Sequence, residues 1–289
     1  MVDVPSRSGA LHVLEWDGPG TDAPTILFMH ANGFNANTYK RILAPLAERF
    51  PIVVFDIRGH GKSTLPADPN EPRANWTTFR DDLLALIDAL DRDQYILSGH
   101  SFGGTMALWA TQSVPGNVTG IVMCDPVIIP VWAGRMVRLF NRVNLGHLLI
   151  PWIKGATNRR ATFPSTEDMF TSFQGRGPFR NWSDDILTDY IADGARSMPD
   201  GQVTLTCAPA WEAAIYKAQV NDFWRHLDRV TCPVHVLWAE KDTTMHPFAA
   251  RLLKRRVPHV TFERVPGASH LLPMEHPDLV QAAFQKVMD

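Results

Sequence analysis

A serine stands inside a Gly-x-Ser-x-Gly frame, residues 99–103, where the flanking residues predict that a strand meets a helix. The apolar run 95–97 indicates a short strand before the frame, and residues 104–110 indicate a helix after it. A serine on such a strained turn tolerates only small neighbours, so the two glycines meet a steric demand. We therefore expect Ser101 to present its hydroxyl as a nucleophile.

Strand-like apolar runs alternate with helical patterns along much of the chain. The predicted strands are residues 25–29, 52–56, 95–98, 118–124, 234–239 and 260–265, with helices such as Trp76–Leu90 between them. Uninterrupted apolar strands indicate burial on both faces, which is typical of an α/β fold with a mostly parallel, doubly wound sheet. Residues 11–16 are candidates for an antiparallel hairpin at the edge.

The alternation stops between residues 127 and 228, where aromatic residues, prolines and arginines occur in shorter, mostly helical pieces. This segment follows the predicted strand 118–124, which is the sixth strand when the two strands of the edge hairpin are counted. It would therefore emerge over the carboxyl edge of the sheet, where open α/β sheets bind ligands. We predict a core domain of residues 1–126 and 229–289, with a helical cap, residues 127–228, inserted after the sixth strand.

The predicted cap is rich in large apolar side chains. Trp132 and Trp152 are candidate substrate contacts, although apolar residues at helical spacing more often form a core. Three arginines share one predicted helix face and either are solvated or guide an anionic ligand; they are Arg135, Arg138 and Arg142.

A serine hydroxyl needs a base to take its proton, and a histidine oriented by a carboxylate is suited to that task. Among the eleven histidines, His270 follows the last predicted strand on a turn, from which it can reach the serine. His246 and His276 precede prolines in turns, His12 belongs to the sheet edge, and His235 lies within a strand. We predict His270 as the base.

Two aspartates are candidates for the orienting carboxylate. Asp242 stands on the loop after the predicted strand 234–239, one strand away from the predicted base. Asp125 directly follows the predicted strand 118–124, from where its carboxylate also reaches the histidine. We expect Asp242 to be the acid and keep Asp125 as the alternative, which otherwise lines the pocket or accepts hydrogen bonds from turn amides.

The chain order serine, aspartate, histidine differs from the orders in chymotrypsin and subtilisin. With the frame around Ser101, this order resembles the α/β-hydrolase fold superfamily over nearly the whole chain, in particular its capped serine esterases and lactonases. The turn that contains Asp56, Arg58 and His60 is similar to one common in capped members, and we interpret it as structural.

The resemblance also implies an oxyanion hole, two backbone N–H groups that hold the negative charge on the attacked carbonyl oxygen. One donor would be the N–H of Phe102, at the positive end of the following helix. The other would be the N–H of Asn32, in a loop similar to the family's His-Gly-x-Gly segment with Ala31 in place of the first glycine. His30 would brace this loop or contact substrate, and the Asn32 amide is either a substrate contact or a turn former.

No motif indicates a cofactor or a metal. Gly61, Lys62 and Ser63 imitate the end of a phosphate loop, but Asp56 stands where that motif needs its first glycine. Thr64 stands where a dinucleotide fingerprint needs its third glycine, and the histidines are not clustered as metal ligands. We expect neither a cofactor nor a metal.

Composition limits the partners of the chain. A net charge of −2 provides no basic field for nucleic acid. Residues 1–20 lack the pattern of a signal peptide, and no run of 18 apolar residues predicts membrane insertion. Cys124, Cys207 and Cys232 cannot all pair, which suits a reducing compartment. We expect a cytoplasmic protein that acts on a small molecule; the sequence does not indicate its oligomeric state.

These observations predict a serine hydrolase that cleaves carboxylic esters of small or medium hydrophobic substrates through an acyl-enzyme. A lactonase is the nearest alternative, because some family members, such as the fungal zearalenone lactonases, carry the acid after the sixth strand, where Asp125 stands. Carbon–carbon bond hydrolases and cofactor-free haloperoxidases share the scaffold, whereas Ser101 excludes the aspartate-nucleophile chemistry of haloalkane dehalogenases and epoxide hydrolases. A receptor that binds a ligand without turnover is the distant alternative.

Overall fold

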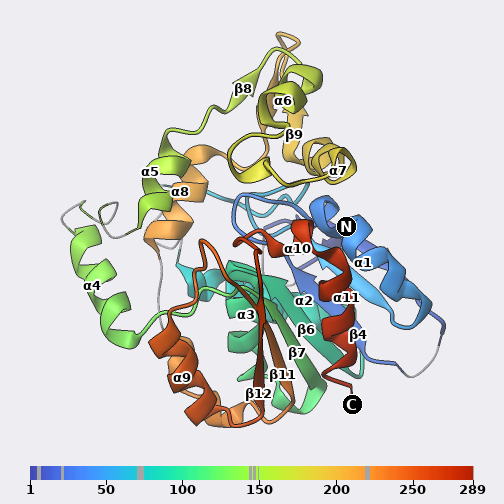
Figure 1. Ribbon diagram of the computed structural model, residues 1–289. Coiled ribbons are helices and arrows are strands. Elements are labelled where there is room, and N and C mark those ends of the chain that lie inside the picture. Colours follow the sequence, from blue (N-terminus) through green and yellow to red (C-terminus); the bar gives the residue numbers. More distant parts are fainter. Residues whose placement is uncertain are drawn as a thin grey trace.

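The computed structural model describes residues 1–4, 8–20, 23–69, 75–142, 145, 148, 150–218 and 222–288. Its centre is a seven-stranded sheet of order β12-β11-β7-β6-β4-β5-β3 (Figure 1). The strands are β3 (Val13–Trp16), β4 (Thr25–Met29), β5 (Ile52–Phe55), β6 (Tyr95–His100), β7 (Val118–Cys124), β11 (Val234–Ala239) and β12 (Val260–Val265). Strand β3 is antiparallel to β5, and the other pairs are parallel.

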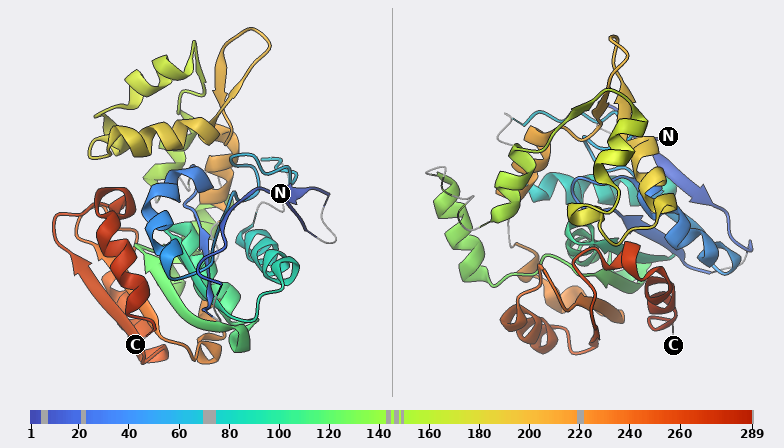
Figure 2. Two further views of the ribbon diagram at one scale, coloured as in Figure 1. Left: turned by 90° about the vertical axis from the view of Figure 1, so that its right-hand side faces the viewer. Right: turned by 45° about the horizontal axis from the view of Figure 1, so that its top comes forward.

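Both faces of the sheet are covered by helices, as the uninterrupted apolar strands predict (Figure 2). Successive residues of a strand point to opposite faces, so Leu27 and Met29 join one core while Ile26 and Phe28 join the other. The first core includes α2 (Trp76–Leu90), α3 (Phe102–Thr111) and α9 (Pro247–Arg256); the second includes α1 (Lys40–Leu43) and α11 (Pro277–Gln285). The doubly wound α/β fold is therefore confirmed.

The amino-terminal edge differs from the predicted hairpin. Residues 13–16 do form an antiparallel edge strand, but β3 pairs with β5 rather than with its own chain neighbour. A separate two-stranded sheet joins β1 (Val2–Asp3) to β2 (Ala10–Leu11). The break between β2 and β3 comes at His12, whose backbone N–H is taken by the Ser63 hydroxyl instead of a strand partner.

An insertion between β7 and β11 lies over the carboxyl ends of the central strands (Figure 1). Its helices are α4 (Val131–Arg142), α5 (Pro151–Thr157), α6 (Thr166–Phe173), α7 (Asp184–Gly194) and α8 (Pro209–Lys217). The insertion also contains an antiparallel sheet of β8 (Thr162–Phe163), β10 (Val203–Leu205) and β9 (Ala195–Ser197), which sequence analysis did not foresee. Strands of two or three residues are too short to show an alternating pattern.

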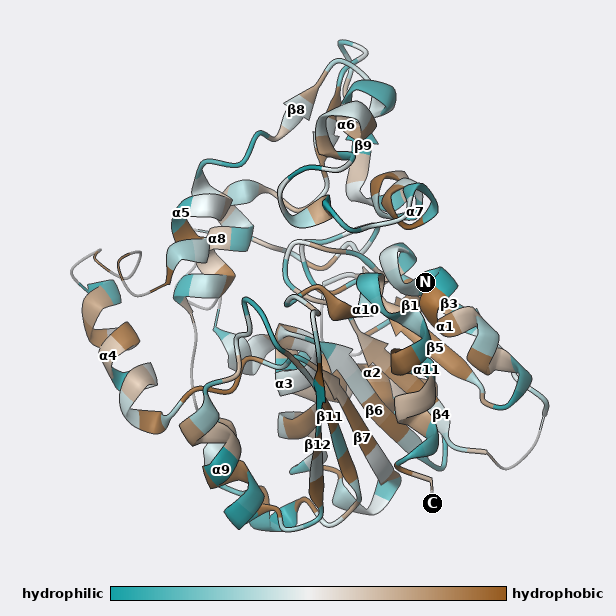
Figure 3. Ribbon diagram, viewed as in Figure 1, coloured by the Kyte–Doolittle hydropathy of each residue, from teal (hydrophilic) through white to brown (hydrophobic). Residues whose placement is uncertain are grey.

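Short helices complete the chain between these elements. Helix α10 (Leu272–Glu275) follows the last strand, and single 3-10 turns occur at Ala36–Tyr39, Ala44–Glu48, Pro115–Asn117, Gly177–Phe179, Asp222–Trp224 and Leu227–Arg229. Hydrophobic residues concentrate in the central strands (Figure 3), and the three cysteines are buried and free. Within the described ranges, no helix has both the length and the apolar character needed to cross a bilayer.

The turn after β5 has the structural character that the sequence indicates. Asp56 has no exposed surface, and its carboxylate accepts hydrogen bonds from the backbone N–H groups of Ala36 and Lys62 at 2.7 and 2.9 Å. Arg58 forms a bidentate ion pair with Asp82 of α2, with both nitrogen to oxygen distances at 2.8 Å. The turn therefore joins the strand edge to helix α2 through buried, fully oriented charges.

Breaking this buried ion pair on one side should destabilise the fold. We expect Arg58→Met to lower the free energy of unfolding by about 3–5 kcal/mol, because it removes the guanidinium that forms two hydrogen bonds with the buried Asp82 carboxylate. The double variant Arg58→Met/Asp82→Leu should recover most of that loss. Urea unfolding of the three proteins measures the effect, and a double variant no more stable than the single one would contradict it.

Candidate active site

The Gly-x-Ser-x-Gly frame forms a sharp turn between β6 and α3. Ser101 adopts φ 55° and ψ −117°, a backbone conformation that a non-glycine residue holds only under constraint. A Cβ on Gly99 would lie 2.5 Å from the carbonyl carbon of Gly103, and a Cβ on Gly103 would lie 2.0 Å from the carbonyl oxygen of Met29. Both glycines are therefore required by close backbone packing.

Ser101, His270 and Asp125 form a hydrogen-bonded line. Nε2 of His270 lies 2.9 Å from Oγ of Ser101, and Nδ1 of the same ring lies 2.6 Å from Oδ2 of Asp125. Ser101 is 8% exposed and Asp125 has no exposed surface. In this arrangement Nδ1–H donates to the carboxylate, which leaves Nε2 free to accept the serine proton.

The Asp125 carboxylate is held by four donors. Oδ1 accepts from the Ala239 backbone N–H at 3.1 Å and the Thr243 hydroxyl at 2.6 Å. Oδ2 accepts from the Thr244 N–H at 3.1 Å, in addition to the His270 ring. These donors use the acceptor positions of an ionised carboxylate and fix its orientation toward the histidine.

The structure does not place Asp242 against His270, contrary to our expectation. Asp242 is exposed, with φ 52°, and the two residues that follow it are the ones that reach inward to Asp125. Strand β7 lies next to β6, so a carboxylate at the end of β7 is already beside the elbow, the turn of residues 99–103 that carries Ser101. The sequence located both loops correctly but did not reveal the left-handed turn that points Asp242 outward.

The two predicted oxyanion donors lie on the loop after β4 and at the start of α3. The N–H of Phe102 belongs to the first residue of α3, where backbone donors have no intrahelical acceptor. Within the described part of the chain, no acceptor takes the N–H of Asn32. The side chain of Asn32 donates instead to the carbonyl oxygen of Glu212 at 3.0 Å, so it ties the loop to helix α8 of the insertion.

His30 braces the same loop and is not placed to contact substrate. Its side chain has no exposed surface; Nδ1–H donates to the Ala31 carbonyl at 2.7 Å, and Nε2 accepts from the Ile57 N–H at 3.0 Å. Burial lowers the pKa of His30, so the ring stays neutral, as these two bonds require. His60 supports the same loop, because its Nε2 accepts a hydrogen bond from the Gly33 N–H at 3.0 Å.

Only one of the two predicted tryptophans approaches His270. The ring of Trp152 on α5 lies 6.1 Å from the ring of His270, centroid to centroid. Trp132 on α4 is more than half exposed and forms no ring contact with His270 in the described structure. Trp152 therefore remains a candidate wall of the substrate site, whereas Trp132 belongs to the outer surface.

A second line of hydrogen bonds, which sequence analysis missed, joins the elbow to the loops on either side. The Tyr39 hydroxyl lies 3.3 Å from the Ala31 N–H, which donates to it, and 2.7 Å from Nδ1 of His100. Nε2–H of His100 donates to the carbonyl oxygen of His270 at 2.8 Å. Burial and the neighbouring His270 lower the pKa of His100, while burial raises that of Tyr39, so the phenol stays the donor and the imidazole neutral.

The insertion also contacts the loop after β4, residues 30–34, which carries the predicted donor Asn32. Arg159 donates to the Glu212 carboxylate at 3.0 Å and to the Tyr190 hydroxyl at 2.7 Å. Gly33 has φ 84°, and a Cβ on it would lie 2.7 Å from Oε1 of Glu212, so glycine is favoured where the loop passes beneath this pair. The guanidinium charge of Arg159 is thus already balanced by a carboxylate of the same subdomain.

One group of side chains in the described chain brings three metal-type ligand atoms within 4.8 Å of one another: His12, Asp56 and Asp193. His12 already lies 2.7 Å from Asp56, and the Lys62 ammonium lies 2.6 Å from Asp193. Protein donors therefore balance these carboxylates, and the group joins the insertion to the turn after β5.

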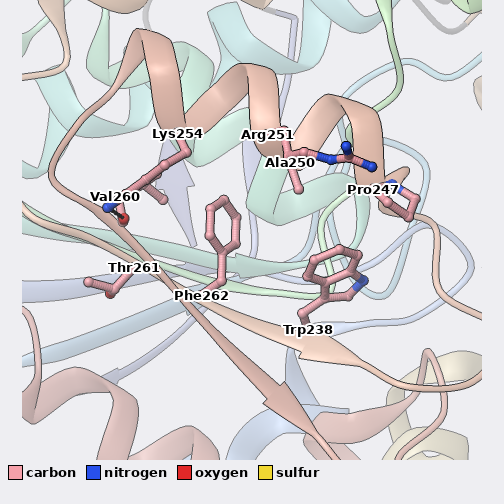
Figure 4. Close-up of a pocket in the computed structure, with 8 residues that line it drawn as sticks. All are labelled: Trp238, Pro247, Ala250, Arg251, Lys254, Val260, Thr261 and Phe262. Carbon is pink, nitrogen blue, oxygen red and sulfur yellow. Dashed lines mark hydrogen bonds between the residues drawn. The ribbon is translucent and has the colours of Figure 1, made fainter.

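A pocket of about 520 Å³ lies between helix α9 and the edge of the sheet (Figure 4). Trp238 and Phe262 project from β11 and β12 toward the helix, with Arg251 and Pro247 on the opposite wall. None of its lining residues belongs to the line of Ser101, His270 and Asp125 or to the loop after β4. This pocket is therefore separate from the candidate active site.

The chain belongs to the alpha/beta hydrolase fold family, whose model matches residues 24–277. Among characterised proteins it is 26% identical to 2-(acetamidomethylene)succinate hydrolase of Mesorhizobium japonicum, over 92% of this chain and 88% of that protein. It is 24% identical to 3-oxoadipate enol-lactonase 2 of Acinetobacter baylyi, over 92% and 89% of the two chains. It is 22% identical to human (lyso)-N-acylphosphatidylethanolamine lipase, over 93% and 80%.

Solved structures agree on the fold. The crystal structure of E-2-(acetamidomethylene)succinate hydrolase superposes with a TM-score of 0.77 at 23% identity, covering 100% of this chain and 97% of that one. A thermophilic esterase from Thermogutta terrifontis superposes with a TM-score of 0.67 at 22% identity, covering 99% and 96%. The resemblance to α/β-hydrolases is thus confirmed, and the relatives are hydrolases.

Removing the Tyr39 hydroxyl should slow hydrolysis by disturbing the backbone that carries His270. We expect Tyr39→Phe to lower kcat by roughly tenfold, with KM little changed, because His100 loses the donor that fixes its ring. Tyr95→Phe is the matched control, since the Tyr95 hydroxyl is also buried and bonded, to the Ile87 carbonyl, but far along β6 from the elbow. Both variants should lose about 1–3 kcal/mol of stability. Equal kcat values in the two variants would contradict a positioning role for Tyr39.

Proposed function

We propose that this hydrolase is a serine enzyme that cleaves carboxylic esters through an acyl-enzyme intermediate. The observation that carries the proposal is the line from Ser101 to His270 to Asp125, with distances of 2.9 and 2.6 Å. A buried carboxylate, a singly oriented imidazole and a serine on a strained elbow are the parts that nucleophilic acyl transfer needs.

In the proposed reaction Oγ of Ser101 attacks the acyl carbon while Nε2 of His270 accepts the hydroxyl proton. The carbonyl oxygen becomes negative and is held by the N–H groups of Asn32 and Phe102. Collapse of this intermediate breaks the bond to the alcohol oxygen, which takes the proton from His270 and leaves. Water then attacks the acyl carbon while Nε2 of His270 accepts one of its protons. Collapse breaks the bond to Oγ of Ser101, which takes that proton back from His270 as the acid product leaves.

Aromatic side chains around the proposed site support a hydrophobic substrate of small or medium size. Trp152 lies 6.1 Å from the His270 ring, and Phe34 lies 6.2 Å from the His100 ring. Phe34 in turn contacts Trp182 and Tyr190 of the insertion. The acyl or alcohol group of the substrate would be placed between these rings and the elbow.

A lactone is the second candidate substrate, and two observations favour it. Asp125 follows β7, which is the predicted sixth strand, and the zearalenone lactonases carry their acid after that strand. One relative of the chain is an enol-lactonase. The chemistry is the same except that the leaving alcohol stays attached to the acyl group. Ester and lactone hydrolysis are therefore to be separated by substrate, not by triad variants.

Asp125 should be the working acid. We expect Asp125→Asn to lower kcat by about 10⁴-fold, because the amide favours the wrong imidazole tautomer, while Asp242→Asn stays within about twofold of wild type. Steady-state hydrolysis of a nitrophenyl ester, with melting curves as a check on folding, makes the comparison. A severe loss in Asp242→Asn with Asp125→Asn nearly intact would reverse the assignment.

The substrate class is tested with nitrophenyl esters of increasing chain length and a series of lactones, on wild type and Ser101→Ala. We expect turnover of esters with short or medium acyl chains, a fall of at least about 10⁴-fold in Ser101→Ala, and labelling of Ser101 by a fluorophosphonate probe. Turnover of lactones alone would select the second candidate. Full activity in Ser101→Ala, or a folded protein that the probe does not label, would reject a serine mechanism.

A further inference from the structure

Helix α4 exposes an apolar stripe. Trp132, Met136 and Leu139, spaced four and three residues apart, lie on one side of the helix and are 56%, 42% and 59% exposed. Gly134 and Val137 face the protein instead. A surface helix normally turns its apolar stripe toward the core, so this helix carries a second stripe that nothing in the described chain covers. Helix α4 stands at the periphery of the molecule in both Figure 1 and the right panel of Figure 2.

Positive charge accompanies this stripe. Residues 126–166 contain no aspartate or glutamate, although the whole chain carries a net charge of −2. Arg135 and Arg142, seven residues apart on α4, are exposed and form no ion pair within the described structure. The same stretch also contains Arg138, Lys154 and Arg160, besides Arg159, whose charge Glu212 balances. A helix that combines exposed tryptophan and leucine with arginine on the adjoining side is typical of the surface of a membrane.

We propose that the exposed side chains of α4 form a docking surface for an anionic lipid bilayer, made of Trp132, Met136 and Leu139 flanked by Arg135 and Arg142. Apolar side chains enter the boundary of the acyl chains while arginines meet lipid phosphates, so one partner satisfies both features. A second copy of this chain is less suited, because a symmetric contact would bring two acid-free surfaces against each other.

The docking surface lies on the same side of the molecule as helix α5 (Figure 1). Helix α5 follows α4 in the chain, and its half-exposed Trp152 contacts the His270 ring at 6.1 Å. Figure 3 shows hydrophobic residues along α4. Binding through this surface would turn the side of the molecule that carries Trp152 toward the lipid. The inference stands on binding alone and does not depend on which bond the serine cleaves.

The test uses the full-length protein and vesicle flotation, with phosphatidylcholine alone and with phosphatidylcholine mixed with phosphatidylglycerol. We expect binding to the mixed vesicles at about 0.1 M salt and release at about 1 M, where the Debye length falls from about 10 to about 3 Å. Arg135→Glu/Arg142→Glu should weaken partitioning by at least about thirtyfold. Met136→Ser/Leu139→Ser should also abolish flotation while leaving the melting temperature unchanged, because both side chains are exposed.

Arg180→Glu/Arg196→Glu is the matched control, since it makes the same change in net charge at exposed arginines of other elements of the insertion. This control should float like wild type. The proposal is overturned if wild type does not bind mixed vesicles, or if the control loses binding as strongly as the α4 variants. It is also overturned if sedimentation shows a dimer that Met136→Ser/Leu139→Ser dissociates, which would give the surface to a second copy.

Discussion

The carboxylate of Asp125 is the interaction on which the arrangement of the site depends. Asp125 directly follows the last residue of β7 and is buried. Three of the four donors to its carboxylate come from the end of β11 and the loop after it: Ala239, Thr243 and Thr244. The fourth is the ring of His270, on the loop after β12. One buried charge thus binds the ends of three adjacent strands together and sets the angle of the imidazole toward the serine. Because an unpaired buried carboxylate is costly, the fold and the orientation of the His270 ring are stabilised by the same group.

The sequence predicted the parts of this protein that follow from periodicity and close packing. The predicted strands 25–29, 118–124, 234–239 and 260–265 are found with the same bounds. The first three are mostly apolar and buried, whereas the last is an edge strand with exposed polar residues. The elbow was also predictable, since its glycines answer a steric requirement local to five residues.

What the sequence could not supply was the direction of turns and the pairing of residues far apart in the chain. The choice between Asp242 and Asp125 depends on a left-handed backbone at both positions, with φ 52° and 41°, which no pattern of side chains announces. Tyr39 and His100 are sixty-one positions apart and meet only because β4 and β6 are neighbours. The small sheet of the insertion was missed because its strands have only two or three residues, too few to show an alternating pattern.

Two independent sets of contacts converge on the loop after β4. From within the core, His30 and His60 engage its backbone, held neutral by burial, which lowers the pKa of His60 to about 3. From the insertion, the backbone carbonyl oxygen of Glu212 accepts a hydrogen bond from the side-chain amide of Asn32. Donors in an oxyanion hole are effective only when they are fixed before the charge forms. The insertion is therefore part of what orients the proposed N–H donor of Asn32, because helix α8 holds the side chain of that residue.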